Sequence, residues 1–359
     1  MSLTPPTPRL RVDDFDYDLP QTAIAQVPME PRDASRLLVL DRARSQPGRP
    51  HLRHLTFAQL GSQLRAGDLL VTNDSRVLPA RLVATRSSGG GAEVLVLRPI
   101  PDAGTWEALV RPSRRIDVGD RLTLRSGDTV EVGERLSDGT RAIRFHRDPL
   151  AVMDDAGEMP LPPYIGDRSS PAERYQTVYA RPPGSAAAPT AGLHFSPRLL
   201  DELAAQGVRR ANVTLHVGLD TFRPLEGSYV DEHHIHREWY EIPLATRRAM
   251  PAARRAGGRV VAVGTTTVRV LETRAHGGVA SGWTSLYITP PHAFASIDAL
   301  ITNFHLPRSS LLLLVTAWVQ AGMTGASPYQ ARDTLLAAYR VALEAGYRFF
   351  SFGDAMLIV

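Results

Sequence analysis

The pattern of apolar and polar residues changes twice along the chain and divides it into three stretches. In the first, up to about residue 75, short apolar runs at 37–40 and 69–72 predict buried strands. Between 78 and 148, short strand-like runs alternate with Gly, Asp and Ser turn residues, without a helical period. Evenly spaced strands of this kind predict a small antiparallel β-barrel. Its expected strands are 81–85, 93–97, 106–110, 121–124, 129–132 and 141–145.

From about residue 150 onward, helical and strand patterns alternate, which predicts an α/β domain. Ser196-Pro197 and Ser327-Pro328 are helix start signals, because each is a capping residue followed by a proline in the first turn. These helices should end at Gly207 and Gly346. The other expected helices are 246–256, 265–275 and 309–320, and the expected strands are 208–217, 259–263, 299–302 and 348–352.

These patterns predict a discontinuous α/β main domain with an inserted small antiparallel β-barrel domain. Residues 10–77 and 149–359 form the α/β domain in this prediction, and residues 78–148 form the barrel. Residues 1–9 are rich in proline and are expected to be a disordered tail.

Composition excludes several kinds of chemistry. The 359 residues suffice for two domains, and 43% hydrophobic with 22% charged residues is ordinary for a globular protein. The sequence has no cysteine, which excludes disulfides, zinc–thiolate sites, iron–sulfur clusters and thiol nucleophiles. It has no lysine either, so all 41 basic residues are arginine, and a Schiff base or a P-loop lysine is excluded.

The net charge of +4 and the clustered arginines suit a polyanion such as RNA, since the guanidinium fork pairs with phosphate in two parallel hydrogen bonds. A plain solvated basic surface fits the same charge. The first residues lack the apolar core of a signal peptide, and the longest apolar run, 311–319, is too short to cross a bilayer. We therefore expect a soluble cytoplasmic protein without a membrane association.

Residues 175–197 include a long irregular run of Gly, Pro, Ser and Thr that ends in Leu193-His194-Phe195. Compact domains rarely keep such a loop unless it binds or reacts with something. A neutral His194 could act as a general base, and a hydrogen-bonded structural histidine fits the residue type equally well. His216 and His305 follow expected strands and could line the same pocket, or serve the structure only.

Three other segments carry candidate polar groups. The strand–glycine–threonine sequence at 259–269 offers backbone N–H groups and hydroxyls to a carboxylate or phosphate, although it also fits an ordinary helix cap. Asp354 follows the strand expected at 348–352 and could orient a histidine, hold a ligand or make a turn. The segment 73–76 could belong to a cleft or to a domain hinge.

The tract 231–238 carries imidazoles and carboxylates two residues apart, which is compatible with a metal site on a strand face. Short histidine tracts are more often solvated, and the helical metalloprotease pattern HExxH is absent from the sequence. We therefore expect no metal here.

Taken together, the motifs resemble one family, the S-adenosylmethionine:tRNA ribosyltransferase-isomerases of queuosine biosynthesis. The similar segments follow one another in the family's order over nearly the whole chain. They are DFDYDLP (14–20), SRLLVLDR (35–42), GDLLVTNDSRVLPARL (67–82), MPLPPYI (159–165), YQTVYA (175–180), APTAGLHF (188–195), VTLHVG (213–218), VAVGTTTVR (261–269), DALITNFHLP (298–307) and YRFFSFGDAMLI (347–358).

The resemblance implies an activity. Such enzymes move the ribosyl part of S-adenosylmethionine onto the aminomethyl group of a 7-deazaguanine at the tRNA wobble position. Adenine and methionine leave, and an epoxycyclopentanediol forms. S-adenosylmethionine is then a co-substrate, the tRNA is the partner, and no metal, redox cofactor or obligatory protein partner is expected. An α/β domain with an inserted barrel is also what the family implies.

The resemblance also implies roles for particular residues. We expect His194 to be the base, His216 and His305 to be supporting groups, and Asp354 to orient one of them. The residues expected to bind the co-substrate are Thr190, Gly192, Gly264, Thr265, Thr266, Thr267, Arg269 and Asn303. The residues expected to bind the RNA are Asn73, Arg76, Tyr175, Gln176, His233, His236, Arg111, Arg114 and Arg115.

Two segments depart from the family pattern. The usual LHVGAGTF carries Leu219-Asp220 here, and the segment 287–294 lacks the family's glycine. Three alternatives to the ribosyltransferase-isomerase stay open, the first two because of these departures and the third because of the histidine tract. They are an enzyme of the same family with another deazapurine or RNA acceptor, a non-catalytic RNA-binding protein of this fold, and a metal hydrolase built on the tract 233–236.

Overall fold

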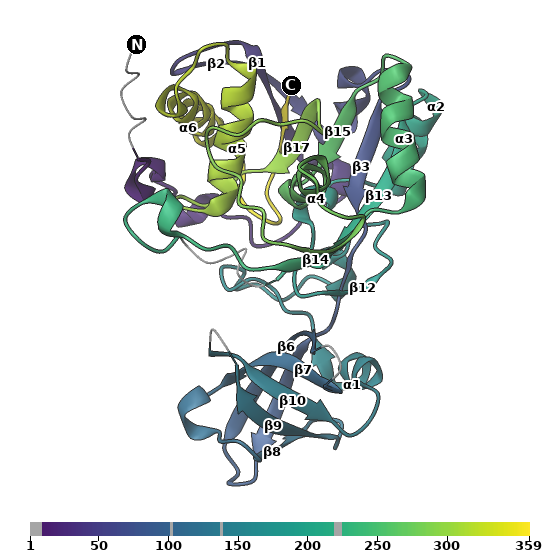
Figure 1. Cartoon of the computed structure of the whole chain (residues 1–359), viewed down its shortest axis with the longest axis vertical. Coiled ribbons are helices and arrows are strands. Elements are labelled where there is room, and N and C mark those ends of the chain that lie inside the picture. Colours follow the sequence, from purple (N-terminus) through teal and green to yellow (C-terminus); the bar gives the residue numbers. More distant parts are fainter. Residues whose placement is uncertain (1–8, 101–102, 137–138, 219–224) are drawn as a thin grey trace.

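The computed structural model describes residues 9–100, 103–136, 139–218 and 225–359. The tail expected at 1–9 lies outside these residues except for Arg9, and so do Leu219 and Asp220. The molecule has two lobes, a large α/β lobe and a β-barrel that projects from it (Figure 1). None of the helices in the described ranges is both long and apolar enough for a membrane span.

A nine-stranded mixed sheet forms the centre of the large lobe, in the order β16-β14-β13-β3-β15-β17-β18-β1-β2. The strands β13, β3, β15 and β17 are parallel, and β18 runs antiparallel to β17 and parallel to β1. The bounds are β1 Arg36–Gln46, β2 Arg49–Thr56, β3 Leu69–Asn73, β13 Arg209–Leu215, β14 Glu238–Glu241, β15 Val260–Val263, β16 Ser281–Thr284, β17 Ala299–Asn303 and β18 Ala355–Ile358.

Helices cover both faces of this sheet, which explains why its central strands read as continuous apolar runs. Alternate residues of β3 show the two faces: Leu69 and Val71 pack under one group of helices, and Leu70 packs with Leu199 and Leu203 of α2 on the other. The helices are α2 Pro197–Ala205, α3 Leu244–Arg255, α4 Thr265–Ala275, α5 Ser310–Gly322 and α6 Pro328–Glu344. As expected, the hydroxyls of Ser196 and Ser327 accept N-cap hydrogen bonds.

The barrel consists of β5 to β10 and closes through the pairing of β5 with β8. Leu82, Val94, Leu122, Val130 and Ile143 are fully buried inside it. The strands are β5 Arg81–Arg86, β6 Gly91–Ile100, β7 Thr105–Arg111, β8 Arg121–Leu124, β9 Thr129–Arg135 and β10 Arg141–Phe145. Every strand expected in this stretch is present, so the predicted fold class is confirmed.

The chain leaves the barrel through α1, Pro149–Ala156, and β11, Gly157–Glu158. Val152 and Met153 of α1 belong to the barrel core, and β11 pairs with β5. The boundary expected at residue 148 lies just before this helix. On the large lobe, β4 (Arg76–Val77) pairs with β12 (Pro183–Ser185) near the junction of the lobes. Short 3-10 helices complete the fold at Val12–Phe15, Gln21–Ala23, Arg32–Ala34, Phe57–Gln63, Ser113–Arg115, Ala172–Tyr175, Thr190–Gly192 and Val230–Glu232.

The strand expected at 348–352 is wrong: the last strand, β18, begins only at Ala355. Residues 348–354 form a buried turn instead, in which Phe350 has a φ of 71° and Gly353 lies so close to the carbonyl of Arg348 that a Cβ would clash with it. The aromatic side chains in this turn are buried as they would be in a strand. Their apolar run therefore could not distinguish the two conformations.

Asp68, just before the first residue of β3, joins this strand to the start of β15 and should contribute strongly to stability. Its buried carboxylate accepts hydrogen bonds from the backbone of Arg65 and Arg259 and pairs with the Arg259 guanidinium at 2.6 Å. Asp68→Ala should lower the free energy of unfolding by about 3 kcal/mol in denaturant titration, because it leaves these donors unpaired. Asp155→Ala, which breaks an exposed pair with Arg147, should change it by less than about 1 kcal/mol. Equal effects of the two substitutions would contradict this.

Candidate active site

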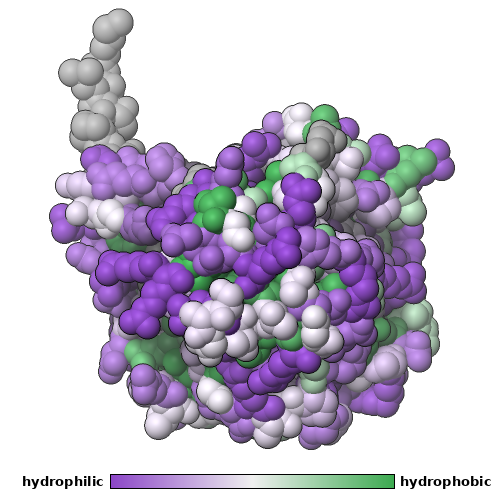
Figure 2. Space-filling view, turned by 90° about the horizontal axis from the view of Figure 1, so that it is seen from below, coloured by the Kyte–Doolittle hydropathy of each residue, from purple (hydrophilic) through white to green (hydrophobic). Residues whose placement is uncertain are grey.

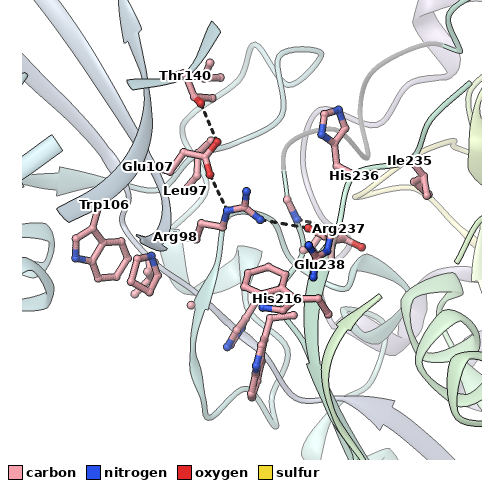
Figure 3. A pocket seen from close by; sticks show the side chains of 18 of the residues that line it. Leu97, Arg98, Trp106, Glu107, Thr140, His216, Ile235, His236, Arg237 and Glu238 are labelled. Carbon is pink, nitrogen blue, oxygen red and sulfur yellow. Dashed lines mark hydrogen bonds and ion pairs between the residues drawn. The ribbon is translucent and has the colours of Figure 1, made fainter. Parts of the chain in front are cut away.

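A cavity of about 540 Å³ lies between the barrel and the large lobe (Figure 3). The barrel contributes Arg98, Trp106 and Glu107, while the large lobe contributes groups from the end of β13, from β14 and from α4. A smaller cavity of about 60 Å³ lies at the carboxyl ends of β15 and β17, where ligands of open α/β sheets usually bind. Val217 and Leu311 line both cavities, so the two adjoin.

His216 follows the last residue of β13 and lines the larger cavity. Its ring stacks on Trp239, with centroids 5.2 Å apart and an interplanar angle of 18°. Gly184 has a φ of 146°, and a Cβ there would lie 2.7 Å from the imidazole, so only glycine lets β12 pack against this ring. The Nδ1 atom is buried and has no hydrogen-bond partner among the described residues. Burial lowers the pKa of His216 to about 4, which keeps the ring neutral near pH 7.

Arg269, on the second turn of α4, places a buried guanidinium in the wall of the same cavity. Its Nη1 forms a close ion pair with Glu238, and its Nε donates to the Leu286 carbonyl at 3.2 Å. Glu238 also accepts from the backbone N–H of Gly218 at 2.8 Å. The Nη2 group has no partner in the described part of the chain. A buried, unpaired donor of this kind suits a carboxylate or phosphate.

The turn that begins α4 faces the smaller cavity. Gly264 adopts a φ of 89°, which favours glycine, and Thr265 and Thr266 follow it into the lining. Thr267 does not reach the cavity, because its hydroxyl donates to the Val263 carbonyl at 2.7 Å. Asn73, expected to bind RNA, is buried behind this turn and exchanges two hydrogen bonds of 3.0 Å with the backbone of Leu215, which fixes the strand end that carries His216.

His194 lines neither cavity. Its Nδ1 lies 2.8 Å from the Ser35 hydroxyl, and its Nε2 lies 3.2 Å from the amide nitrogen of Asn303. Asn303 in turn accepts from the Thr190 hydroxyl at 2.9 Å, and both Asn303 and Thr190 line the smaller cavity. Burial, with smaller contributions from Arg348 and Arg32, lowers the pKa of His194 to about 3. The geometry therefore gives this histidine a positioning contact with Asn303.

His305 lines the smaller cavity, two residues after the end of β17. Its Nε2 is 3.3 Å from the Thr302 hydroxyl, and its Nδ1 is 3.4 Å from the Tyr339 hydroxyl. Burial lowers the pKa of His305 to about 3. The three histidines expected in one pocket are thus separated. His216 lines the larger cavity, His305 lines the smaller cavity, and His194 is packed behind the smaller cavity.

Several other expected residues support the site from outside the two cavities. Asp354 accepts from the backbone N–H groups of Arg36 and Arg348, at 2.9 and 2.8 Å, and not from a histidine. Gly192 lies where a Cβ would meet the Tyr179 hydroxyl at 2.2 Å, so it serves close packing.

The expected RNA-binding residues Arg76, Tyr175 and Gln176 make structural contacts, and two of them join the segment 76–77 to the segment 173–176. The Gln176 amide exchanges two hydrogen bonds with the Val77 backbone, as a neighbouring strand would. Tyr175 is buried against Phe352. Arg76 pairs with the Glu173 carboxylate through both of its terminal nitrogens. None of these side chains lines either cavity.

The remaining expected RNA-binding residues are exposed or lie at the larger cavity. His233 and His236 line it, whereas Arg111, Arg114 and Arg115 are exposed on and after β7, outside it. No acidic residue in the described ranges forms an ion pair with these three arginines. Seen from the barrel end, the molecule presents a surface on which hydrophilic residues predominate (Figure 2).

Neither cavity is lined by the segment 288–294, one of the two departures from the family pattern. Its His292 lies 3.5 Å from the buried carboxylate of Glu272, which is also 3.4 Å from His276. These three, rather than the tract 231–238, are the described residues whose geometry could suit a metal ion. Glu272 also accepts from the backbone of Ala295 and Ser296 and so ties the segment to α4.

Sequence reasoning missed the aromatic and charged groups that the barrel and β16 bring to the larger cavity. Arg98, Trp106, Glu107 and Trp283 line it from elements far apart in the sequence. Their spacing in the sequence did not indicate that they meet in one cavity. The only available signal for these residues was the rarity of tryptophan, since the chain has four, and it could mark Trp106 and Trp283 as candidates without showing that they meet.

The fold and the cavity define a class of protein, an α/β protein whose inserted β-barrel forms one wall of a site with a half-buried, neutral histidine and a buried arginine. The sequence model described as "Queuosine biosynthesis protein" matches residues 12–358. The chain belongs to this family, so the resemblance found in the sequence is confirmed.

Similar proteins cover both lobes. The chain is 49% identical to the S-adenosylmethionine:tRNA ribosyltransferase-isomerase of Moorella thermoacetica, over 98% of this chain and 100% of that protein. It is 45% identical to the protein of the same name from Thermotoga maritima, over 98% and 100% of the two chains. The crystal structure of S-adenosylmethionine tRNA ribosyltransferase from Thermotoga maritima is similar with a TM-score of 0.54 and 38% identity, over 96% of this chain and 100% of that one.

The buried histidines should make the fold sensitive to acid. Because the pKa of His194 is about 3 in the fold and near 6.5 in the unfolded chain, the unfolded state binds the extra proton below pH 6.5. The free energy of unfolding should therefore fall as the pH drops from about 6.5 towards 3, by at most about 1.4 kcal/mol per pH unit for one such group. His194→Asn should make this slope shallower in denaturant titrations at several pH values, whereas His51→Asn on the surface should not. An unchanged slope in His194→Asn would contradict the burial argument.

Proposed function

We propose that this chain is an S-adenosylmethionine:tRNA ribosyltransferase-isomerase of queuosine biosynthesis. It transfers and isomerises the ribosyl moiety of S-adenosylmethionine onto 7-aminomethyl-7-deazaguanine at the tRNA wobble position and releases adenine and methionine. The observation that carries the proposal is the family match over residues 12–358, which takes in the main domain and the barrel that together form the larger cavity. We place the reaction in the cytoplasm, with tRNA as the partner.

The chemistry requires proton transfer and positioning. The sulfonium acidifies the adjacent 5′ carbon, so a neutral base can remove its proton; the resulting ylide expels adenine. The aminomethyl group of the deazaguanine then attacks the ribose-derived aldehyde, and ring closure releases methionine. The protein must therefore supply a base within hydrogen-bond reach of the 5′ carbon. It must also supply fixed hydrogen-bond donors for the anionic parts of the substrates.

His216 is the histidine whose position best suits the base. It lines the larger cavity, it is neutral near pH 7, and its Nδ1 has no partner among the described residues. An anionic substrate beside it would raise its pKa towards the range in which a base works well. His194, our expectation from the resemblance, instead contacts Asn303 from behind the smaller cavity, and we assign it a positioning role.

The co-substrate is held where the two cavities adjoin. In this proposal the Nη2 of Arg269, which has no partner among the described residues, binds the carboxylate of the methionine part. Thr190, Thr265, Thr266 and Asn303 offer polar groups in the smaller cavity for the sugar or the base. His305 supports the same pocket, and Asp354 braces the backbone that surrounds it.

The RNA reaches the larger cavity from its open side in this proposal. His233 and His236 lie in the wall, and the exposed Arg111, Arg114 and Arg115 contact phosphates further along the RNA. Asn73, Tyr175 and Gln176 act indirectly, through the backbone segments that they hold.

Mass spectrometry tests the function. An anticodon stem-loop carrying the aminomethyl-deazaguanine is incubated with the protein and S-adenosylmethionine. We expect the RNA to gain the mass of the epoxycyclopentanediol unit while adenine and methionine are released. Adenine release without modified RNA would indicate another acceptor. A folded protein that releases no adenine would contradict the proposed enzyme and favour a binding protein.

Two histidine substitutions test the assignment of the base. His216→Asn should reduce single-turnover adenine release by about 10²- to 10⁴-fold, the usual contribution of a general base. His194→Asn should keep more activity and raise the KM for S-adenosylmethionine, because it disturbs Asn303 rather than the proton transfer. His51→Asn, at an exposed position, should behave as the wild type. If His194→Asn abolishes adenine release in a folded protein while His216→Asn preserves it, the base is His194.

A further inference from the structure

Three of the chain's four tryptophans line the larger cavity. Trp239 on β14 and Trp283 on β16 are directly opposite each other in the antiparallel register, so their side chains project from the same face of the sheet. His216 stacks on Trp239. The fourth tryptophan, Trp318, is buried in the core. These three aromatic side chains (His216, Trp239 and Trp283), which we call the tryptophan platform, therefore line the cavity from neighbouring positions of the sheet.

Trp283 is the exposed member of this platform, with 38% of its surface accessible. Two guanidinium groups lie over its ring: Arg98 at 5.0 Å and Arg237 at 5.8 Å from the centroid. Arg98 comes from the barrel, where it pairs with Glu107 at 2.7 Å, and it also lies 3.5 Å from the Arg237 carbonyl (Figure 3). Arg237 pairs with no acidic side chain in the described residues. The two lobes thus place positive charge around one exposed aromatic ring.

This combination selects among ligands. An aromatic surface alone suits a planar base or a cation such as a sulfonium. Glu107 balances the charge of Arg98, whereas Arg237 has no acidic partner among the described residues and therefore repels a cation and attracts the phosphate of a nucleotide. A single-stranded nucleotide satisfies both features, because its base stacks on the ring while its phosphate meets the arginines.

We propose that Trp283, Arg98 and Arg237 form a stacking subsite for an anticodon-loop nucleotide adjacent to the one being modified. The inference rests on the proposed function, since it takes RNA as the acceptor. The flanking base stacks on Trp283, and the RNA passes over the platform so that the modified base reaches His216 deeper in the cavity. Because Arg98 belongs to the barrel, the bound RNA contacts both lobes at this point.

RNA binding without S-adenosylmethionine tests the subsite. With an unmodified anticodon stem-loop as the probe, Trp283→Ala should weaken binding by about 5- to 150-fold, the range for loss of one stacked base. Trp283→Phe should restore most of the affinity, yet it should lose much of the tryptophan fluorescence quenching that RNA binding causes.

Arg237→Ala should reduce the salt dependence of RNA binding by about one phosphate contact. Tyr329→Ala is the matched control, because Tyr329 is another ring beside a guanidinium, Arg332 at 4.9 Å, but lies outside the cavity.

The outcomes separate the subsite from the function. Unchanged RNA affinity in a folded Trp283→Ala variant, together with normal modification by the wild type, would overturn the subsite and leave the function in place. Equal quenching in the wild type and Trp283→Phe would also overturn it. A wild type that neither binds nor modifies the stem-loop would overturn both proposals.

Discussion

The buried ion pair between Glu238 and Arg269 is the interaction on which the larger cavity depends. It joins β14 to α4, and its two side chains also hold the backbone at Gly218 and Leu286. Removing one partner from such a pair costs about 3–5 kcal/mol, because it leaves an uncompensated buried charge. Arg269 lines the cavity, and its buried Nη2 has no partner among the described residues. The same contact therefore fixes the wall and leaves one donor group available behind it.

The two lobes have separate tasks around this pair. The large lobe supplies the ends of parallel strands and the first turns of α4, which provide the buried polar groups of both cavities. The barrel is a closed sheet with its own core, and it supplies an opposing wall with Arg98, Trp106 and Glu107. A reaction between a small sulfonium substrate and a large RNA requires both an enclosed pocket and an accessible surface. The position of the larger cavity between the lobes meets both requirements.

The fold could be predicted from the sequence wherever local pattern and local structure agree. The barrel strands follow from alternation and turn residues, and the helix starts follow from Ser196 and Ser327. The turn at 348–354 could not, because its aromatic residues are as apolar as those of a strand. The lining of the two cavities could be predicted only in part. His216, His305 and Arg269 follow from strand ends and motifs, but the position of His194 behind the smaller cavity and of Trp283 in the larger one depends on tertiary packing. Sequence spacing carries no record of such contacts.

We infer that the ribosyl transfer takes place in the cavity between the lobes, beside His216 and Arg269. A crystal structure of the protein with S-adenosylmethionine and an anticodon stem-loop that carries unreactive guanine tests this. We expect the methionine carboxylate within hydrogen-bond distance of Arg269 Nη2 and the 5′ carbon next to the His216 ring. A complex with both ligands bound outside this cavity would contradict it.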